Sequence, residues 1–198
     1  MKLYFIRHGE TDYGTVESRG VRGWATSFAP LSNVGRLQID TIATDYRLQE
    51  ASAILCSSYA RALESAARLS RVLNKALYVE YDLHEWLPQK DSLAEADAGL
   101  LSRANAGLRE EMRLGAGTEE GPWESLGEVR QRVHRVLCRY AHLDSLIVVT
   151  HAVVISAFTG LSRQVEHAEI VDFEVDTSKP LAPLPGVPGT GSSSLQHD

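Results

Sequence analysis

The chain has few cysteines and no excess of positive charge. Cys56 and Cys138 are its only cysteines among 198 residues, which excludes the class of small secreted proteins held together by a disulfide framework. We expect both thiols to be reduced and buried, one in a strand and one in a helix, as in a reducing cytoplasm. The net charge of −6 does not supply the basic surface that nucleic acid or an anionic membrane requires in a main partner.

Long apolar runs are also missing. The first one covers only residues 3–6, too few to cross a membrane or to act as a signal peptide, so we expect no targeting segment and a cytoplasmic protein. The composition, 43% hydrophobic and 23% charged, is typical of a globular protein. A length of 198 residues fits one core better than two, and we expect one domain over residues 1–177.

Short apolar runs alternate with segments of helical periodicity. Four runs have the pattern of buried strands, and a fifth alternates apolar with acidic residues, as an edge strand with one wet face does. These runs are residues 3–6, 53–56, 77–81, 146–150 and 170–175. Among the helical segments, the one that follows Ser125 begins with a capping box to Glu128. Strands that alternate with helices predict an α/β fold, a three-layer sandwich around a mostly parallel sheet.

Two stretches depart from this alternation. Residues 86–121 contain a second capping box, Ser92 with Glu95, which predicts a helix that begins there and ends before a glycine-rich segment. We interpret this stretch as a small helical lid inserted into the domain. Over residues 178–198, proline, glycine and serine dominate without periodicity, so we expect a disordered tail.

Two histidines come directly after buried apolar runs. His8 follows the first predicted strand with Arg7 beside it, and His151 follows the fourth. Because ligands of open α/β sheets gather at the carboxyl ends of strands, both imidazoles should meet in one crevice. Arg61, in the first turn of a helix after another strand, adds a guanidinium where free backbone N–H groups favour an anion. Together these residues predict a phosphate site.

The same residues lie in motifs that occur in a known order. Arg7-His8-Gly9-Glu10-Thr11 resembles the opening motif of the histidine phosphatase superfamily, which includes the phosphoglycerate mutases. Further segments resemble those of the family in the same order, and they are residues 23–24, 30–38, 57–62, 124–133 and 150–151. The resemblance extends from residue 1 to about residue 175, which is far more specific than any single motif.

The resemblance implies a role for each residue of the phosphate site. His8 is the nucleophile that becomes phosphohistidine, while Arg7, Arg61 and His151 bind the phosphoryl oxygens. Physical chemistry agrees, because an imidazole can attack phosphorus while cationic groups stabilise the charge on the equatorial oxygens. No cofactor and no metal are implied, and the expected partner is a small phosphate ester.

The leaving oxygen needs a proton from a positioned acid. Glu85 is the candidate, because it follows the third predicted strand and the segment that contains it resembles the one that carries the family's acid. Asp82 and Asp91 lie nearby in the sequence and are rivals for the same role.

Several positions near the motifs bear on substrate binding. We expect Thr11 and Gly23 at the phosphate or the substrate, as the resemblance implies. Arg22 stands where the family often has Gln, so it is either a replacement donor or a surface charge. Gly14 stands where the family often has an Asn that contacts phosphate, so one contact is missing.

Several other aromatic and histidine residues have simpler interpretations. Trp24, Phe28 and Trp86 either form the wall of the pocket mouth or belong to the core, which is the commoner place for such side chains. The remaining histidines lack the spacing of metal ligands, and they are His84, His134, His142, His167 and His197.

The resemblance therefore implies a phosphatase that hydrolyses small phosphomonoesters through phosphohistidine. A phosphoglycerate mutase is the nearest alternative, because phosphohistidine can return its phosphoryl group to a second hydroxyl. Gly14 and a chain shorter than that branch usually has stand against it. A regulatory module that binds phosphorylated partners without catalysis is a third alternative, which the complete set of candidate catalytic residues disfavours. Substrate and oligomeric state stay open.

Overall fold

A five-stranded sheet forms the centre of the protein. The structure is a computed structural model that describes residues 1–92, 96–114, 121–160 and 163–180. The strands are β1 (Lys2–Arg7), β2 (Ala53–Ser57), β3 (Leu77–Glu80), β4 (Ser145–Thr150) and β5 (Ile170–Glu174). Their order in the sheet is β3-β2-β4-β1-β5, with every neighbouring pair parallel except β1 and β5. The predicted mostly parallel sheet is confirmed, as is an edge position for the last strand.

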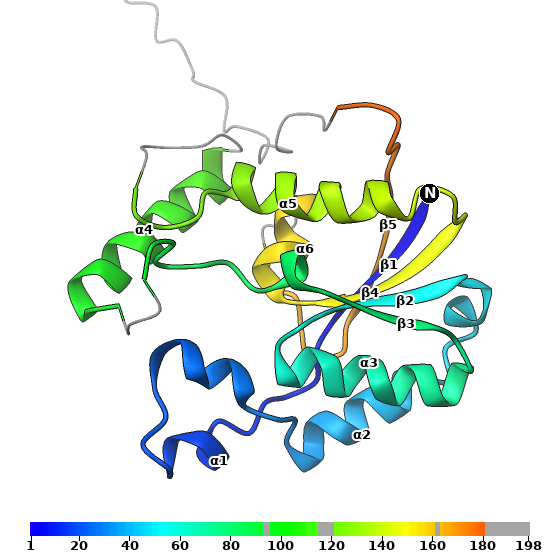
Figure 1. The fold of residues 1–198 in the computed structure, drawn as a ribbon, viewed down its shortest axis with the longest axis horizontal. Coiled ribbons are helices and arrows are strands. Elements are labelled where there is room, and N and C mark those ends of the chain that lie inside the picture. The colour runs from blue at the N-terminus through cyan, green and yellow to red at the C-terminus, as the bar shows by residue number, and fades with distance from the viewer. Residues whose placement is uncertain (93–95, 115–120, 161–162, 181–198) are drawn as a thin grey trace, which may run out of the picture.

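Helices cover both faces of this sheet. They are α1 (Gly14–Glu17), α2 (Asn33–Ile42), α3 (Ala60–Leu73), α4 (Ala98–Leu114), α5 (Leu126–Arg139) and α6 (Ala152–Thr159). Figure 1 shows α2 and α3 on one face and α5 and α6 on the other, with α4 extending beyond the sheet. The predicted three-layer α/β sandwich is therefore confirmed. No helix in the described parts of the chain is long and apolar enough to cross a membrane.

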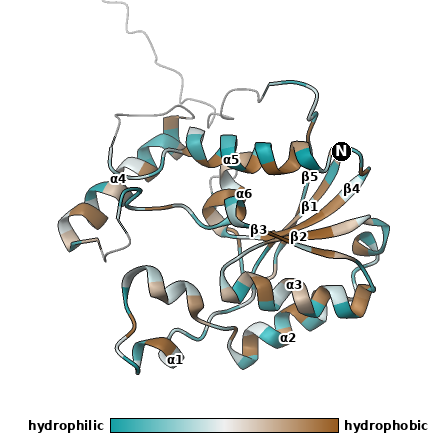
Figure 2. Cartoon of the chain, in the orientation of Figure 1, coloured by the Kyte–Doolittle hydropathy of each residue, from teal (hydrophilic) through white to brown (hydrophobic). Residues whose placement is uncertain are grey.

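The core consists of two apolar layers, one on each face of the sheet. Leu3 and Phe5 of β1 belong to the layer under α5 and α6, while Tyr4 and Ile6 belong to the layer under α2 and α3. This alternation follows from the two-residue period of a strand. Figure 2 accordingly shows hydrophobic residues concentrated in the central strands. Burying one such side chain completely stabilises the fold by roughly 1.5–3 kcal/mol.

Two expectations about burial are wrong. The run at residues 77–81 was expected to be a buried strand, but Tyr78 and Val79 are exposed because β3 lies at an edge of the sheet. Both cysteines are unpaired, yet only Cys56 is buried, where burial raises the pKa of its thiol to about 12. Cys138 lies on the exposed face of α5.

The helix of the predicted lid begins later than expected. α4 begins at Ala98, and the Asp97 carboxylate accepts a hydrogen bond of 2.7 Å from the Leu100 backbone N–H. A start at Ser92 is therefore wrong, because Asp97 caps the first turn instead. Glu95, the second residue of the predicted box, lies outside the described residues. So do residues 181–198, which make up most of the predicted tail.

The loop after β1 fits closely against the N-terminus of α2. A Cβ atom on Gly9 would lie 2.4 Å from the carbonyl oxygen of Gly35, and one on Gly35 would lie 2.1 Å from that of Glu10. Only glycine permits such an approach. Gln38 Oε1 accepts a hydrogen bond of 2.9 Å from the Glu10 backbone N–H, and Ser32 Oγ donates one of 2.6 Å to Glu10 Oε1. These contacts hold the loop that carries the first histidine.

Candidate active site

The strand order brings the two strand-end histidines together. β1 and β4 are parallel neighbours in which Arg7 pairs with Thr150, so His8 and His151 are the next residues on adjacent strands. The His8 backbone N–H donates to the Thr150 carbonyl at 3.1 Å. The two imidazole rings are 5.1 Å apart between centroids, and both are buried.

His8 is held as a neutral imidazole with a defined tautomer. Its Nδ1 lies 2.7 Å from the Gly9 carbonyl oxygen, and a carbonyl can only accept, so Nδ1 carries the hydrogen. Nε2 therefore has the free electron pair, which accepts a hydrogen bond of 3.1 Å from Arg61 Nε. Burial, and then the positive charge of Arg61, keeps the pKa of His8 well below its usual range. A neutral imidazole with a free electron pair is the form that acts as a nucleophile.

Two arginines flank His8. Arg61 is buried in the first turn of α3, and its guanidinium lies 5.0 Å from the centre of the Tyr59 ring. Arg7 donates from Nη1 to the Val165 carbonyl at 2.6 Å, and its Nε is buried without a hydrogen-bond partner in the structure. Two guanidinium groups beside a neutral imidazole suit a dianionic phosphoryl group.

Two polar atoms of other predicted site residues are buried without a partner among the described residues. They are Nδ1 of His151 and Oγ1 of Thr11. Nε2 of His151 is fixed by Ser57 Oγ at 2.8 Å, and burial, then the neighbouring His8, keeps the pKa of His151 well below its usual range. Because buried polar atoms normally have hydrogen-bond partners, these groups fit the oxygens of a bound anion.

His167 belongs to this cluster, although no sequence motif places it there. Its ring lies 5.7 Å from that of His8. The next residue, Ala168, has a φ of 57°, in the left-handed region that alanine rarely adopts. The Ala168 backbone N–H donates to the Arg7 carbonyl at 3.0 Å, which holds the loop before β5 against the end of β1. Such strained positions gather at functional sites, and no local sequence pattern identifies them.

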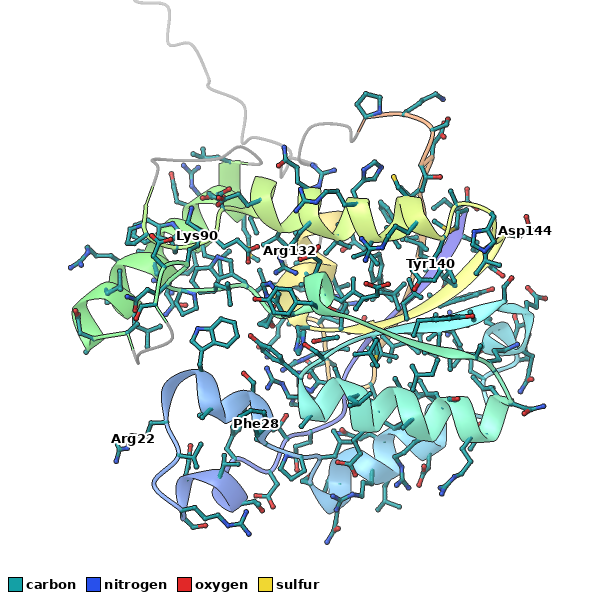
Figure 3. The ribbon with its side chains drawn as sticks, in the orientation of Figure 1. Arg22, Phe28, Lys90, Arg132, Tyr140 and Asp144 are labelled. Carbon is teal, nitrogen blue, oxygen red and sulfur yellow. The ribbon has the colours of Figure 1, made fainter. Side chains whose placement is uncertain are left out.

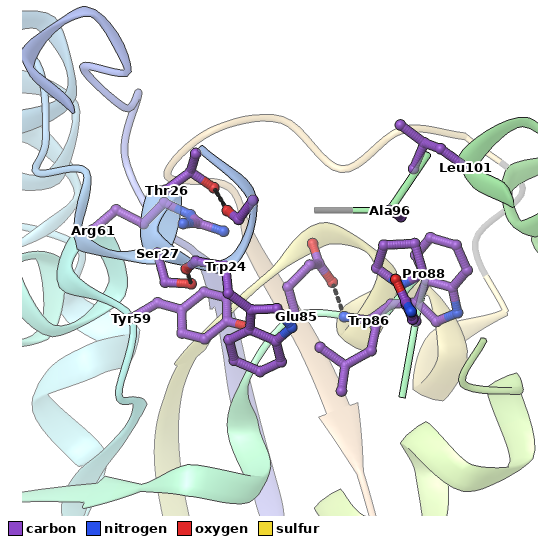
Figure 4. A pocket seen from close by; sticks show the side chains of 13 residues that line it. Trp24, Thr26, Ser27, Tyr59, Arg61, Glu85, Trp86, Pro88, Ala96 and Leu101 are labelled. Carbon is purple, nitrogen blue, oxygen red and sulfur yellow. Dashed lines mark hydrogen bonds between the residues drawn. The ribbon is translucent and has the colours of Figure 1, made fainter. Parts of the chain in front are cut away.

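A cavity of about 380 Å³ opens beside this cluster. Arg61 and Glu85 both line it, and Figure 4 shows the Glu85 side chain pointing into the space that faces Arg61. The Trp86 backbone N–H donates to Glu85 Oε1 at 2.9 Å. Burial raises the pKa of Glu85, and this effect outweighs the opposing influence of the Trp86 hydrogen bond and of Arg61. A carboxyl group of raised pKa is suited to donate a proton.

A buried ion pair fixes the segment that carries Glu85. Arg132 of α5 bonds to both carboxylate oxygens of Glu124, at 2.5 and 3.0 Å. The same guanidinium donates to the carbonyl oxygens of Asp82 at 2.5 Å and of Glu85 at 3.4 Å. The Leu87 backbone N–H donates to Glu124 Oε2 at 3.3 Å. Glu124 and Arg132, from the family-like segment at residues 124–133, therefore position the segment of the candidate acid.

A family comparison agrees with the strand-end geometry. The model of the histidine phosphatase superfamily (branch 1) matches residues 3–179. The chain belongs to the histidine phosphatase superfamily. A search of curated proteins finds no match.

Solved structures share the histidine phosphatase fold with this chain. They include a mycobacterial glucosyl-3-phosphoglycerate phosphatase in complex with VO3, at 19% identity and a TM-score of 0.64, covering 86% of this chain and 91% of that chain. A putative alpha-ribazole-5'-P phosphatase from Escherichia coli has 21% identity and a TM-score of 0.62, with coverages of 87% and 89%. YhfR from Bacillus stearothermophilus has 22% identity and a TM-score of 0.65, with coverages of 94% and 97%.

Not every predicted site residue of this member of the histidine phosphatase superfamily reaches the cavity. Gly23 lines it, whereas Arg22 is exposed and its side chain points away from the protein (Figure 3). Binding by Arg22 stays a prediction, without support from this arrangement. Neither rival acid lines the cavity, since Asp91 is exposed and Asp82 is only partly buried outside it. Glu85 is thus the best placed of the three.

Of the three aromatic residues considered for the pocket mouth, two line the cavity and one does not. Trp24 and Trp86 line the cavity, and Trp86 also belongs to the core. Phe28 is 75% exposed and belongs to neither. Among the described residues, no group of three or more His, Cys, Asp or Glu side chains could hold a metal ion.

Proposed function

We propose that this protein is a phosphatase that hydrolyses small phosphomonoesters through a phosphohistidine on His8, in the cytoplasm, where its unpaired cysteines stay reduced. The observation that carries the proposal is the neutral imidazole of His8. Its free Nε2 electron pair accepts a hydrogen bond from Arg61, which also lines the cavity that contains Glu85. Two structural neighbours, a glucosyl-3-phosphoglycerate phosphatase and a putative alpha-ribazole-5'-P phosphatase, support the same reaction class.

The reaction begins when a phosphate ester enters between the two arginines. Arg61 transfers its hydrogen bond from His8 Nε2 to a phosphoryl oxygen, which frees the Nε2 electron pair. Nε2 forms a bond to phosphorus while the bond from phosphorus to the alcohol oxygen breaks on the opposite side. Arg7, Arg61 and His151 stabilise the charge on the equatorial oxygens.

Glu85 donates its proton to the departing alcohol oxygen. Water then attacks phosphorus and gives a proton to the Glu85 carboxylate while the bond to Nε2 breaks. Inorganic phosphate leaves, and His8 returns to the neutral imidazole. Arginine and histidine side chains supply all the positive charge in this scheme. Turnover should therefore persist after chelation of divalent ions.

A quench experiment tests the proposal. Purified protein is mixed with a ³²P-labelled ester, stopped within milliseconds and divided between acid and base. Wild type should carry label that acid removes and base does not, the behaviour of a phosphoramidate, and should release inorganic phosphate. His8→Ala should do neither, whereas His134→Ala, which alters a partly buried histidine of α5 outside the cavity lining, should behave as wild type. Equal labelling of His8→Ala and wild type would contradict the proposal.

A further inference from the structure

The cavity continues beyond Glu85, away from the phosphoryl end. In the view of Figure 4, Arg61 lies on one side of Glu85, and Pro88, Ala96 and Leu101 lie on the other. The acid must contact the oxygen that joins phosphorus to the leaving group. The leaving group itself therefore occupies the part of the cavity on the far side of Glu85, if the proposed phosphatase mechanism holds.

The wall of that part is apolar and aromatic. Leu87, Pro88, Ala96 and Leu101 are apolar, and Trp24, Tyr59 and Trp86 add aromatic rings to the lining of the cavity. The indole N–H of Trp86 donates to the carbonyl of Glu124 in the protein interior. Aromatic walls of this kind bind flat apolar groups, which gain both buried area and ring contacts.

The hydroxyl groups in the wall are already engaged. Thr26 Oγ1 donates to the Gly23 carbonyl at 2.7 Å, and Ser27 Oγ donates to the Trp24 carbonyl at 2.6 Å. Both bonds lie within the 3₁₀ helix Gly23–Phe28. Their hydrogens are thus unavailable to a ligand, and apart from Arg61 and Glu85 the other polar side-chain groups of the described lining are uncharged, those of Gln89, Tyr59 and Trp24.

The wall also lacks a cation for a charged leaving group. Among the 13 described lining residues, Arg61 is the one base and Glu85 the one acid, and both belong to the phosphoryl end. The bases adjacent in sequence to the wall do not enter it. Arg22 points away from the protein (Figure 3), and Lys90 Nζ bonds to Glu128 Oε1 at 2.9 Å. A carboxylate or second phosphate there would lose its hydration without gaining a partner.

We propose that this enzyme selects phosphomonoesters whose leaving group is an uncharged, apolar alcohol, preferably one with an aromatic ring. The inference rests on the proposed phosphatase function and adds the class of substrate. It also predicts that esters with a second anionic group, such as phosphorylated hydroxy acids, are poor substrates.

Matched esters test the inference. Benzyl phosphate, 4-methylbenzyl phosphate and 4-carboxybenzyl phosphate have the same reacting centre, and the last two have similar size but differ in charge. The kcat/KM for 4-methylbenzyl phosphate should exceed that for the carboxylated ester by about tenfold or more. Turnover of p-nitrophenyl phosphate that depends on His8 serves as the separate measure of the phosphatase function.

A charge placed in the wall should change this preference. Leu101→Arg should lower the methyl-to-carboxyl ratio by about threefold or more, because the new guanidinium faces the carboxylate. Leu114→Arg is the matched control, on the same helix and similarly exposed (47% against 41% for Leu101) but outside the cavity lining. It should leave the ratio unchanged.

The outcomes are distinguishable. Equal kcat/KM for the methyl and carboxyl esters, with His8-dependent p-nitrophenyl phosphate turnover intact, would overturn the inference alone. An equal change of the ratio in Leu114→Arg and Leu101→Arg would also overturn it. Absence of His8-dependent turnover for every ester would overturn the proposed function on which the inference rests.

Discussion

The two ends of the cavity are built from different parts of the fold. At the phosphoryl end, His8 and His151 directly follow strands β1 and β4, and Arg61 opens the helix after β2, all buried. At the other end, Leu101 belongs to α4, which lies beyond the sheet, and its side chain is exposed (Figure 1). Parallel strands fix the first set within a rigid sheet, whereas the second set can change without disturbing it. In the proposed mechanism, the sheet therefore positions the catalytic residues, and α4 contributes to the binding of the leaving group.

Glu85 lies where the two ends meet, and its replacement has the largest expected effect after that of the nucleophile. Glu85→Gln should slow phosphoenzyme formation from benzyl phosphate by about 10²- to 10⁴-fold, because the alkoxide then leaves without a proton. With p-nitrophenyl phosphate, whose leaving group is stable as an anion, the loss should be less than about tenfold. Single-turnover kinetics with both esters measure the difference.

Asp82→Asn and Asp91→Asn are the controls for this experiment. Each should retain the wild-type ratio between the two esters, because neither side chain lines the cavity. If Glu85→Gln lost the same factor on both esters, Glu85 would not be the acid. The acid would then be Asp82 or Asp91, whichever residue's variant lost turnover of benzyl phosphate but not of p-nitrophenyl phosphate.

Loss of the buried ion pair between Arg132 and Glu124 should lower the stability of the fold. Glu124→Ala leaves the buried Arg132 unpaired, so the free energy of unfolding should fall by about 3–5 kcal/mol. Glu110→Ala removes an exposed ion pair with Arg113 on α4 and should cost less than about 0.5 kcal/mol. Urea denaturation of the two variants measures both values, and similar losses would contradict the role given to Glu124.

The phosphoryl end could be predicted from sequence because it depends on strand order. His8 and His151 each follow an apolar run, and parallel strands place such positions at one edge of the sheet. Arg61 followed from its place after β2. Each of these placements follows from a local sequence pattern and from the fact that parallel strands end at the same edge of an α/β sheet.

The far end could not be predicted in the same way. Trp24 and Phe28 both belong to the 3₁₀ helix Gly23–Phe28, yet only Trp24 lines the cavity, because at three residues per turn two side chains four positions apart point in different directions. His167 reaches the site through the left-handed backbone of Ala168, which has no sequence signature in alanine. Ser92 and Asp97 can both cap a helix, and tertiary contacts decide between them.

The pH dependence of the single-turnover rate should reflect the protonation states of His8 and Glu85. The rate with benzyl phosphate requires neutral His8, whose lowered pKa keeps it neutral through pH 6.5, and protonated Glu85, whose pKa is raised above 4.5. The single-turnover rate should therefore not rise through pH 6.5 and should fall as Glu85 loses its proton above its raised pKa. Glu85→Gln should lack this basic limb. A rate that rises with the ordinary pKa of histidine would contradict the assignment of His8.

His167 should have the smallest effect. Its positive charge lowers the pKa of His8, so His167→Asn should raise that pKa and move the acid limb of kcat/KM for p-nitrophenyl phosphate to higher pH. The rate at neutral pH should change by only about twofold to fivefold, because no hydrogen bond to the nucleophile is lost. His134→Asn, which alters a partly buried histidine of α5 outside the cavity lining, should leave the acid limb in place. An unchanged acid limb in His167→Asn would remove His167 from the site's electrostatics.

The position of the phosphoryl group on the enzyme tests the central claim most directly. Because Nδ1 of His8 donates to the Gly9 carbonyl and Nε2 holds the free electron pair, the trapped intermediate should be phosphorylated at Nε2 of His8. ³¹P NMR of the trapped protein, with peptide mapping of the same sample, distinguishes the two ring nitrogens and the residue. We predict one Nε2-phosphohistidine signal at His8. A phosphoryl group on Nδ1, on His151 or on an oxygen atom would contradict the mechanism.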